Sequence, residues 1–212
     1  MSENTVKVWD PLVRIFHWSL VVFFVIAYFT GEEESDLHIY SGYAVLALIM
    51  FRIVWGLVGS QYARFSNFIY SPANVIAYLK SLVSKHPKHY LGHNPAGGYM
   101  IVFLLVMLLI TSLTGLKVYG LEGHGPLADS IEFSIISTVV ADEDGHREDE
   151  HKGRDQENED AEDFWEEIHE LASNFTVFLI FIHVLAVVLS GRLHRENLVK
   201  AMVTGEKEIH KN

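Results

Sequence analysis

The sequence contains no cysteine, and that absence excludes several kinds of site. Without thiols the chain forms no disulfides, no cysteine-ligated iron–sulfur clusters and no covalent haem attachment through a CxxCH motif. Basic side chains are also few, with 16 Lys and Arg against 27 Asp and Glu and a net charge of −11. Residues 1–10 are polar and no small-residue cleavage site follows the first apolar run, so we expect no cleaved signal peptide. Any prosthetic group must be held by side chains other than cysteine.

Half of the residues are hydrophobic, and they gather in long runs rather than being spread along the chain. The runs cover residues 12–29, 39–58, 98–116 and 171–190. Runs of about 18 or more apolar residues are typical of transmembrane helices, because that length spans the hydrocarbon layer of a bilayer. The sequence therefore predicts an all-α membrane protein with a bundle of four transmembrane helices, forming one domain over residues 1–212.

Lysine and arginine are distributed unevenly between the loops. Twelve of the sixteen fall in residues 1–17, 52–98 and 191–212, and the other four lie between the third and fourth runs. Loops rich in these residues stay on the cytoplasmic side of a membrane. We therefore expect both termini in the cytoplasm and the acidic loops at 30–37 and 117–168 on the outer side.

Two histidines, His169 and His183, lie fourteen residues apart in the fourth predicted helix. At 100° per residue this spacing places their imidazoles within about 40° of one face and about 21 Å apart along the helix axis. Polar side chains inside a membrane are costly and are by default functional. Two ligand-type side chains on one face, each near a different membrane surface, predict two separate sites.

Two further histidines match this pair in depth. His17, near the start of the first helix, shares the inner level with His183, and His38, which opens the second helix, shares the outer level with His169. Two imidazoles from facing helices are the axial ligands that six-coordinate b-type haem iron needs, and such iron has no open position for oxygen. The sequence therefore predicts two haems between helices, paired His17–His183 and His38–His169, that transfer electrons.

Arginines and a glycine lie near these histidines. Arg52 is fourteen residues after His38, on the same predicted face at the inner level, where a haem propionate or a lipid phosphate would be its partner. Gly42, one turn beyond His38, lets a flat ligand approach the backbone closely. Arg14, close before His17, is a further candidate for binding the cofactor. Acceptors for the second nitrogen of each imidazole are expected among Thr111, Thr114 and Ser190.

The remaining segments carry weaker signals. A capping residue followed by proline predicts helix starts at Pro11, at Pro72 and at Pro95, and residues 74–85 predict a short amphipathic helix in the membrane interface. The loop histidines, which have no acidic residue or cysteine near them, are expected to be solvated; they are His86, His89 and His93. Residues 142–163 are acidic and lack large apolar side chains, which predicts a disordered extracytoplasmic loop.

Several stretches, in a fixed order along most of the chain, resemble the prokaryotic cytochrome b561 family, which includes the b-type cytochrome subunits of nickel–iron hydrogenases. They are WDPLVRIFHW, the HxxxG of the second span with FRIVWG after it, GHNPAGG, YGLEGHGPLA, and IHE with a histidine fourteen residues later. The resemblance implies a four-helix bundle in a bacterial inner membrane that binds two b haems. By match to the family's ligand positions, the haem ligands are His17, His38, His169 and His183. The acidic insertion at 142–163 departs from the family's pattern and leaves the partner open.

The resemblance also implies electron transfer between the quinone pool and a redox protein on the outer side, either a hydrogenase-like subunit or, given the acidic outer loop, a basic partner such as a c-type cytochrome. A superoxide-to-quinone oxidase of the same family is an alternative. From another class, a divalent-cation binding or transport protein would use the same histidines, although the spans carry no carboxylates at mid-membrane. A purely structural anchor would make the histidine pairing accidental. We expect no nucleic acid among the partners.

Overall fold

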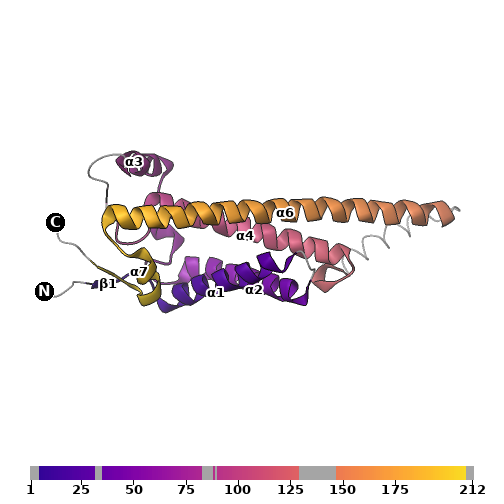
Figure 1. The fold of residues 1–212 in the computed structure, drawn as a ribbon, viewed down its shortest axis with the longest axis horizontal. Coiled ribbons are helices and arrows are strands. Elements are labelled where there is room, and N and C mark those ends of the chain that lie inside the picture. The colour runs from indigo at the N-terminus through magenta and orange to yellow at the C-terminus, as the bar shows by residue number, and fades with distance from the viewer. Residues whose placement is uncertain (1–4, 32–34, 83–87, 89, 129–146, 209–212) are drawn as a thin grey trace. The chain divides into compact units, whose positions relative to one another are not determined.

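The computed structural model describes residues 5–31, 35–82, 88, 90–128 and 147–208, with the backbone alone for residues 147–158 and 208. Helices make up most of these residues (Figure 1). In chain order the elements are β1 (Thr5–Lys7), α1 (Pro11–Phe29), α2 (Asp36–Val58), η2 (Phe65–Asn67), α3 (Pro72–Leu82), α4 (Pro95–Leu121), η3 (Gly125–Leu127), α6 (Arg147–His194), α7 (Leu198–Thr204) and β2 (Glu206–Glu208). Apart from the two short strands, this is the helical architecture that the sequence predicts.

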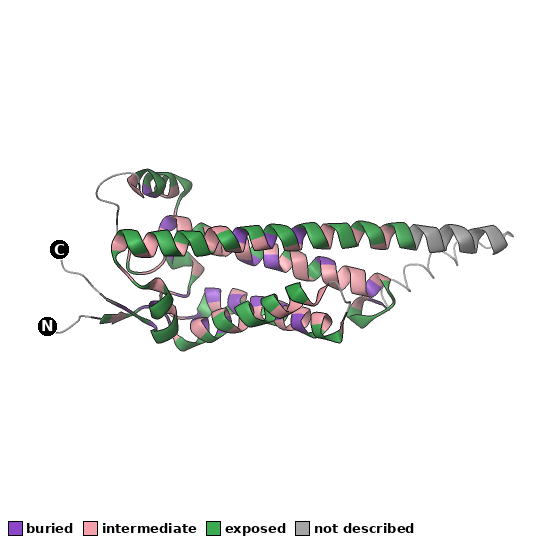
Figure 2. Ribbon diagram, in the orientation of Figure 1, coloured by how far each residue is buried: buried purple, intermediate pink, exposed green. Residues whose placement is uncertain are grey.

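Within the described part of the chain, four helices are long and apolar enough to cross a membrane. They are α1, α2, α4 and the Glu159–His194 part of α6. Only 11–28% of the residues in each apolar window are buried inside the protein, and many of their large apolar side chains are exposed (Figure 2). Outward-facing apolar surface of this extent is typical of contact with a membrane. The four predicted spans are confirmed.

The predicted helix starts are also confirmed. Asp10 caps α1 by accepting a hydrogen bond of 2.9 Å from the amide of Val13, and Pro11 follows as the first helical residue. Asn94 caps α4 in the same way, with 2.7 Å between its Oδ1 and the amide nitrogen of Gly97. Such caps satisfy amides that lack a partner within the helix. The short helix predicted at 74–85 is α3, which begins two residues earlier.

The chain divides into two compact units, where the sequence predicts a single domain. Unit 1 comprises Met1–Val106 and Thr176–Asn212, and unit 2 comprises Met107–Phe175.

In unit 1, α1 and α2 pack along each other (Figure 1). The buried positions of α2 follow a helical spacing of three or four residues: Ser41, Val45, Ile49, Arg52 and Gly56. His38 continues this stripe by one turn, so Arg52 lies on the face of His38, as predicted.

The two ends of the chain pair in a short antiparallel sheet in unit 1, with Val6 opposite Lys207. Before β2, Gly205 adopts a φ of 86°, a conformation that favours glycine, and its carbonyl accepts hydrogen bonds from the amides of Val8 and Trp9. Val8 and Trp9 are buried together with Ala201 of α7. The C-terminal segment therefore fixes the strand that leads into α1.

Helix α6 begins at Arg147, inside the segment 142–163 for which the sequence predicts no regular structure. Residues 142–146 lie outside the described residues. From Arg147 onward the backbone is helical and runs without a break into the fourth span. The segment is rich in glutamate, which favours helix, and no proline follows Pro126 to interrupt it. The charged side chains therefore favour contact with water, but they do not prevent the backbone from forming a helix.

Asp10 joins the start of α1 to the end of α2. Besides capping α1, its Oδ2 accepts hydrogen bonds from Trp55 Nε1 at 3.2 Å and from the hydroxyl of Ser60. Burial raises the pKa of Asp10, but the hydrogen bonds from Ser60, Val13 and Trp55 outweigh that effect and bring the pKa below its ordinary value of 3.8. A carboxyl group with a lowered pKa stabilises the fold above its ordinary pKa, and that contribution is lost as the pH falls through the lowered value.

Replacing Asp10 with alanine is expected to destabilise the protein by about 1–2 kcal/mol at pH 7, the usual cost of losing a cap residue. Asp10→Asn keeps the cap and should have a smaller effect. The thermal unfolding midpoint in detergent measures both, and the difference between the unmodified protein and Asp10→Ala should shrink below pH 3.8. Asp36→Ala, an exposed acid at the start of α2, is the control. Equal midpoints for Asp10→Ala and the unmodified protein at pH 7 would contradict this role.

Candidate haem-binding site

His38, in unit 1, is held by the end of α1. Its Nδ1 lies 2.8 Å from the carbonyl oxygen of Ala27. A carbonyl oxygen only accepts hydrogen bonds, so Nδ1 carries the proton and the lone pair of the neutral ring is on Nε2. Metal-ligating histidines are commonly held in this way. Gly42, one turn further along α2, has open space beside it, because no described atom lies within 4 Å of the position that a Cβ would take.

His169, in unit 2, has an equivalent arrangement on α4. Its Nδ1 lies 2.9 Å from the carbonyl oxygen of Thr111 and 3.1 Å from the hydroxyl of Thr114, so the lone pair is again on Nε2. Both threonines are among the predicted partners. Ser190, the third, instead shares a side-chain hydrogen bond with Tyr78.

A glycine that the sequence does not single out makes room for His169. A Cβ built on Gly115 would lie 2.7 Å from Cε1 of His169, closer than any normal contact. The imidazole therefore packs directly on the backbone of α4, where only glycine leaves space for it. The sequence predicts Thr111 and Thr114 of this span as partners of an imidazole, but it gives no sign that Gly115 next to them makes room for the ring.

The inner pair, His17 on α1 and His183 on α6, lies entirely within unit 1. The two imidazoles are close enough for their charges to interact. The Nδ1 atom of His17 is buried and has no hydrogen-bond partner among the described residues. The predicted inner pair thus lies within one unit, and its joint binding of a haem is still a prediction. Because His38 belongs to unit 1 and His169 to unit 2, the outer pairing stays a prediction.

Both candidate arginines lie in unit 1 and have buried nitrogen atoms without a partner in the described chain. Arg52 is 3% exposed, so it does not extend to lipid phosphate. Its Nη2 donates to the carbonyl of Ala63 at 3.1 Å, whereas its Nη1 is buried and unpartnered. Arg14 donates through Nη1 to the carbonyl of Val203, and its Nε is likewise buried and unpartnered.

His93, for which the sequence predicts solvation, is instead packed between two aromatic rings of unit 1. Its ring centroid lies 4.4 Å from that of Trp9 and 4.6 Å from that of Phe68, and its Nδ1 is buried without a partner among the described residues. Burial and the nearby charges of Arg52 and Lys207 lower the pKa of His93 to about 3, so the ring is neutral at physiological pH. The prediction is wrong because the packing surfaces come from segments distant in sequence.

These residues fit a haem with two imidazole ligands. His38 and His169 each have the proton on Nδ1 and the lone pair on Nε2, the ring state that iron requires. His17 and His183 interact electrostatically within unit 1, and Arg14 and Arg52 of the same unit have buried nitrogen atoms that suit the two carboxylates of a haem. Haem, once bound, supplies iron that changes its oxidation state by one electron.

The cation-binding alternative has less support in the described residues. Across them, no three histidine, aspartate or glutamate side chains come together in a way that would hold a metal ion. His38 and His169 instead each have a fixed ring orientation, set by a backbone carbonyl. Cationic neighbours repel a divalent ion but attract carboxylates.

Comparisons with known proteins agree with this geometry. A family model described as prokaryotic cytochrome b561 matches residues 8–205. The chain is 28% identical to a protein of Azotobacter vinelandii named probable Ni/Fe-hydrogenase B-type cytochrome subunit, over 96% of this chain and 89% of the relative. A protein of the same name from Azotobacter chroococcum is 27% identical over 96% of this chain and 89% of its own length. Another, from Bradyrhizobium diazoefficiens, is 25% identical over 99% of this chain and 88% of its own length. No solved structure gives a significant match.

Proposed function

Because this chain belongs to the prokaryotic cytochrome b561 family, we propose that it is a diheme membrane cytochrome that passes electrons between a quinone and a redox protein on the outer side of the membrane. The observation that carries the proposal is which ring nitrogen is protonated in two histidines. His38 and His169 each give their Nδ1 proton to a backbone carbonyl and keep Nε2 for a ligand. His17 and His183 supply the second site.

In this proposal the histidines pair across helices, His17 with His183 and His38 with His169. Arg14 and Arg52 bind haem carboxylates at the inner site, and Gly42 leaves room for the haem plane along α2. The chain's own contribution is to fix each imidazole through a carbonyl or a close helix backbone and to offset carboxylate charge with guanidinium groups. Two imidazoles on one iron exclude oxygen as a ligand, which favours electron transfer over oxygen chemistry.

The distribution of lysine and arginine supports an orientation with both termini in the cytoplasm of a bacterial cell and the protein in its inner membrane. The outer partner in this proposal is a hydrogenase-like subunit, since the relatives are named as cytochrome subunits of Ni/Fe-hydrogenases. A c-type cytochrome remains a candidate because the outer loop is acidic. The second substrate is a quinone that reaches the cytochrome from the bilayer.

The test is a reduced-minus-oxidised spectrum of the purified protein together with a pyridine haemochrome assay of haem per chain. We expect two b haems per chain and no high-spin signal, because both axial positions of each iron are taken by histidine. One haem would mean that one of the two histidine pairs is wrong. No haem, in protein expressed with ample haem, would overturn the electron-transfer proposal.

A further inference from the structure

Two buried nitrogen atoms of unit 1 lie against the same aromatic ring and have no hydrogen-bond partner among the described residues. Nη1 of Arg52 is one, and the guanidinium carbon of this residue lies 5.9 Å from the centroid of Phe68. Nδ1 of His93 is the other, on a ring whose centroid lies 4.6 Å from that of Phe68. A buried polar group without a partner is costly, and a buried charge more so. The two atoms are therefore candidate donors to a bound acceptor.

The charges around these atoms indicate that the acceptor is an anion. Lys207, the other cation near His93, is already paired, with its Nζ 2.9 Å from Glu196 Oε2 and 3.1 Å from the carbonyl oxygen of Tyr90. Asp10 is the acid whose charge acts on Arg52, but it accepts its hydrogen bonds from Val13, Trp55 and Ser60. Arg52 therefore has a buried positive charge that, among the described residues, makes no hydrogen bond to a carboxylate.

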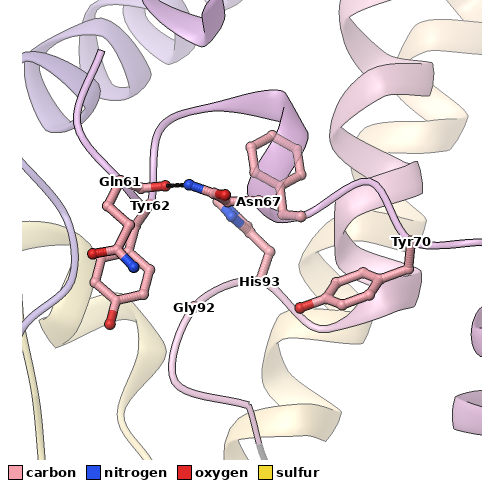
Figure 3. Close-up of a pocket in the computed structure, with 7 residues that line it drawn as sticks. Gln61, Tyr62, Asn67, Tyr70, Gly92 and His93 are labelled. Atoms are coloured by element: carbon pink, nitrogen blue, oxygen red, sulfur yellow. Dashed lines mark hydrogen bonds between the residues drawn. The ribbon is translucent and has the colours of Figure 1, made fainter. Parts of the chain in front are cut away.

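The space beside His93 suits a small charged group. A cavity of about 180 Å³ lies there, lined by His93, Phe68 and polar side chains that include Gln61, Asn67 and Tyr70. Arg52 does not line this cavity, but its guanidinium carbon lies 5.9 Å from the ring centroid of Phe68, which does. Figure 3 shows His93 projecting from its loop toward the segment that carries Gln61 and Asn67. The side-chain amide of Asn67 donates a hydrogen bond to the backbone carbonyl of Gln61. A liquid water takes up about 30 Å³, so the cavity has room for a carboxylate and a few waters.

We propose that Arg52 and His93 bind one carboxylate of the haem that His17 and His183 hold, through hydrogen bonds donated by Nη1 of Arg52 and Nδ1 of His93. This inference rests on the proposed function and adds His93 to the inner site. His183 and His93 both belong to unit 1, and His183 is among the groups that act electrostatically on His93. Trp9 and Phe68 fix the imidazole plane, and the planar guanidinium suits the carboxylate geometry.

His93 is a positioning residue in this proposal, and its effect is on the reduction of the inner haem. An added electron is repelled by the negative charge of a nearby carboxylate. Hydrogen bonds from Arg52 and His93 spread that charge and make reduction easier. Loss of either donor should therefore lower the midpoint potential of the inner haem and leave that of the outer haem unchanged.

The experiment is a potentiometric titration of the full-length protein with both haems bound, comparing His93→Leu and His93→Gln with the unmodified protein. The titration should show one reduction wave for each haem. The wave of the inner haem is identified as the one that remains in the variant His169→Ala, which lacks a ligand of the outer haem. We expect His93→Leu to lower its reduction equilibrium constant about three- to tenfold, with ~59 mV corresponding to tenfold for a one-electron couple. Gln retains a donor and should restore most of the value. His124→Leu, an exposed histidine, is the control.

A double-mutant cycle with Arg52→Gln separates a shared carboxylate from independent effects. If both residues bind one carboxylate, the shift in the double variant should differ from the sum of the single shifts. An unchanged inner wave in His93→Leu with two haems still bound, or strictly additive shifts, would overturn this proposal alone. Fewer than two haems in the unmodified protein would instead be a failure of the proposed function.

Discussion

Replacing His169 with alanine should halve the haem content of the purified protein, from two haems per chain to one, without unfolding it. The imidazole is held by two threonines of α4 through Nδ1, so its only remaining coordinating atom is Nε2. Alanine removes that ligand and leaves the inner pair, His17 and His183, untouched. A non-covalently bound b haem that loses one of its two protein ligands is expected to be lost during purification.

The measurement is a pyridine haemochrome assay normalised to protein, with circular dichroism to confirm that the helices remain. His124→Ala is the matched control, because His124 is exposed and its ring stacks only on Tyr119 in the described chain. The control should keep both haems. Two haems in His169→Ala would remove this histidine from the ligand set and with it the outer pair.

Replacing Gly115 with valine should cause the same loss of one haem, although all four histidines remain. A Cβ at this position would lie 2.7 Å from the His169 ring, and the two extra methyl groups of valine would displace the ring further. Forcing such a group into a packed site typically costs about 1–3 kcal/mol. Removing a glycine from a helix gains only about 0.5–1 kcal/mol, so the steric effect is expected to dominate.

Haem content and the outer midpoint potential measure this effect. Leu113→Val places a β-branched residue on the exposed face of the same helix and is the control for helix propensity. A variant Gly115→Ala, which adds the Cβ alone, should show an intermediate loss. If Gly115→Val keeps two haems with unchanged potentials, the ring of His169 does not depend on the close approach to α4.

The sequence predicts the helices well because their determinants are local. Apolar length marks the four spans, and a capping residue before proline marks the starts of α1, α3 and α4. It also finds the buried face that His38 shares with Arg52, because helical spacing is enough to place these residues. Each of these inferences depends on neighbours within a few turns of one helix.

The features that the sequence misses depend on contacts between distant segments. The ring of His93 packs against Trp9 and Phe68, which come from elsewhere in the chain, and a histidine in a polar loop gives no sign of that. Gly115 matters only because His169 lies against it, 54 residues later. The helix from Arg147 is missed for another reason, since charge density predicts exposure to water but does not decide between helix and loop.

The pairing of β1 with β2 has a consequence for membrane topology. Since Thr5–Lys7 and Glu206–Glu208 form hydrogen bonds with each other, both ends of the chain lie in the same compartment, whichever compartment that is. The number of crossings between them must therefore be even, and four satisfies this parity. Deleting one span would force the sheet to open or a second helix to leave the bilayer. Reporter proteins fused to the two ends would accordingly give the same answer.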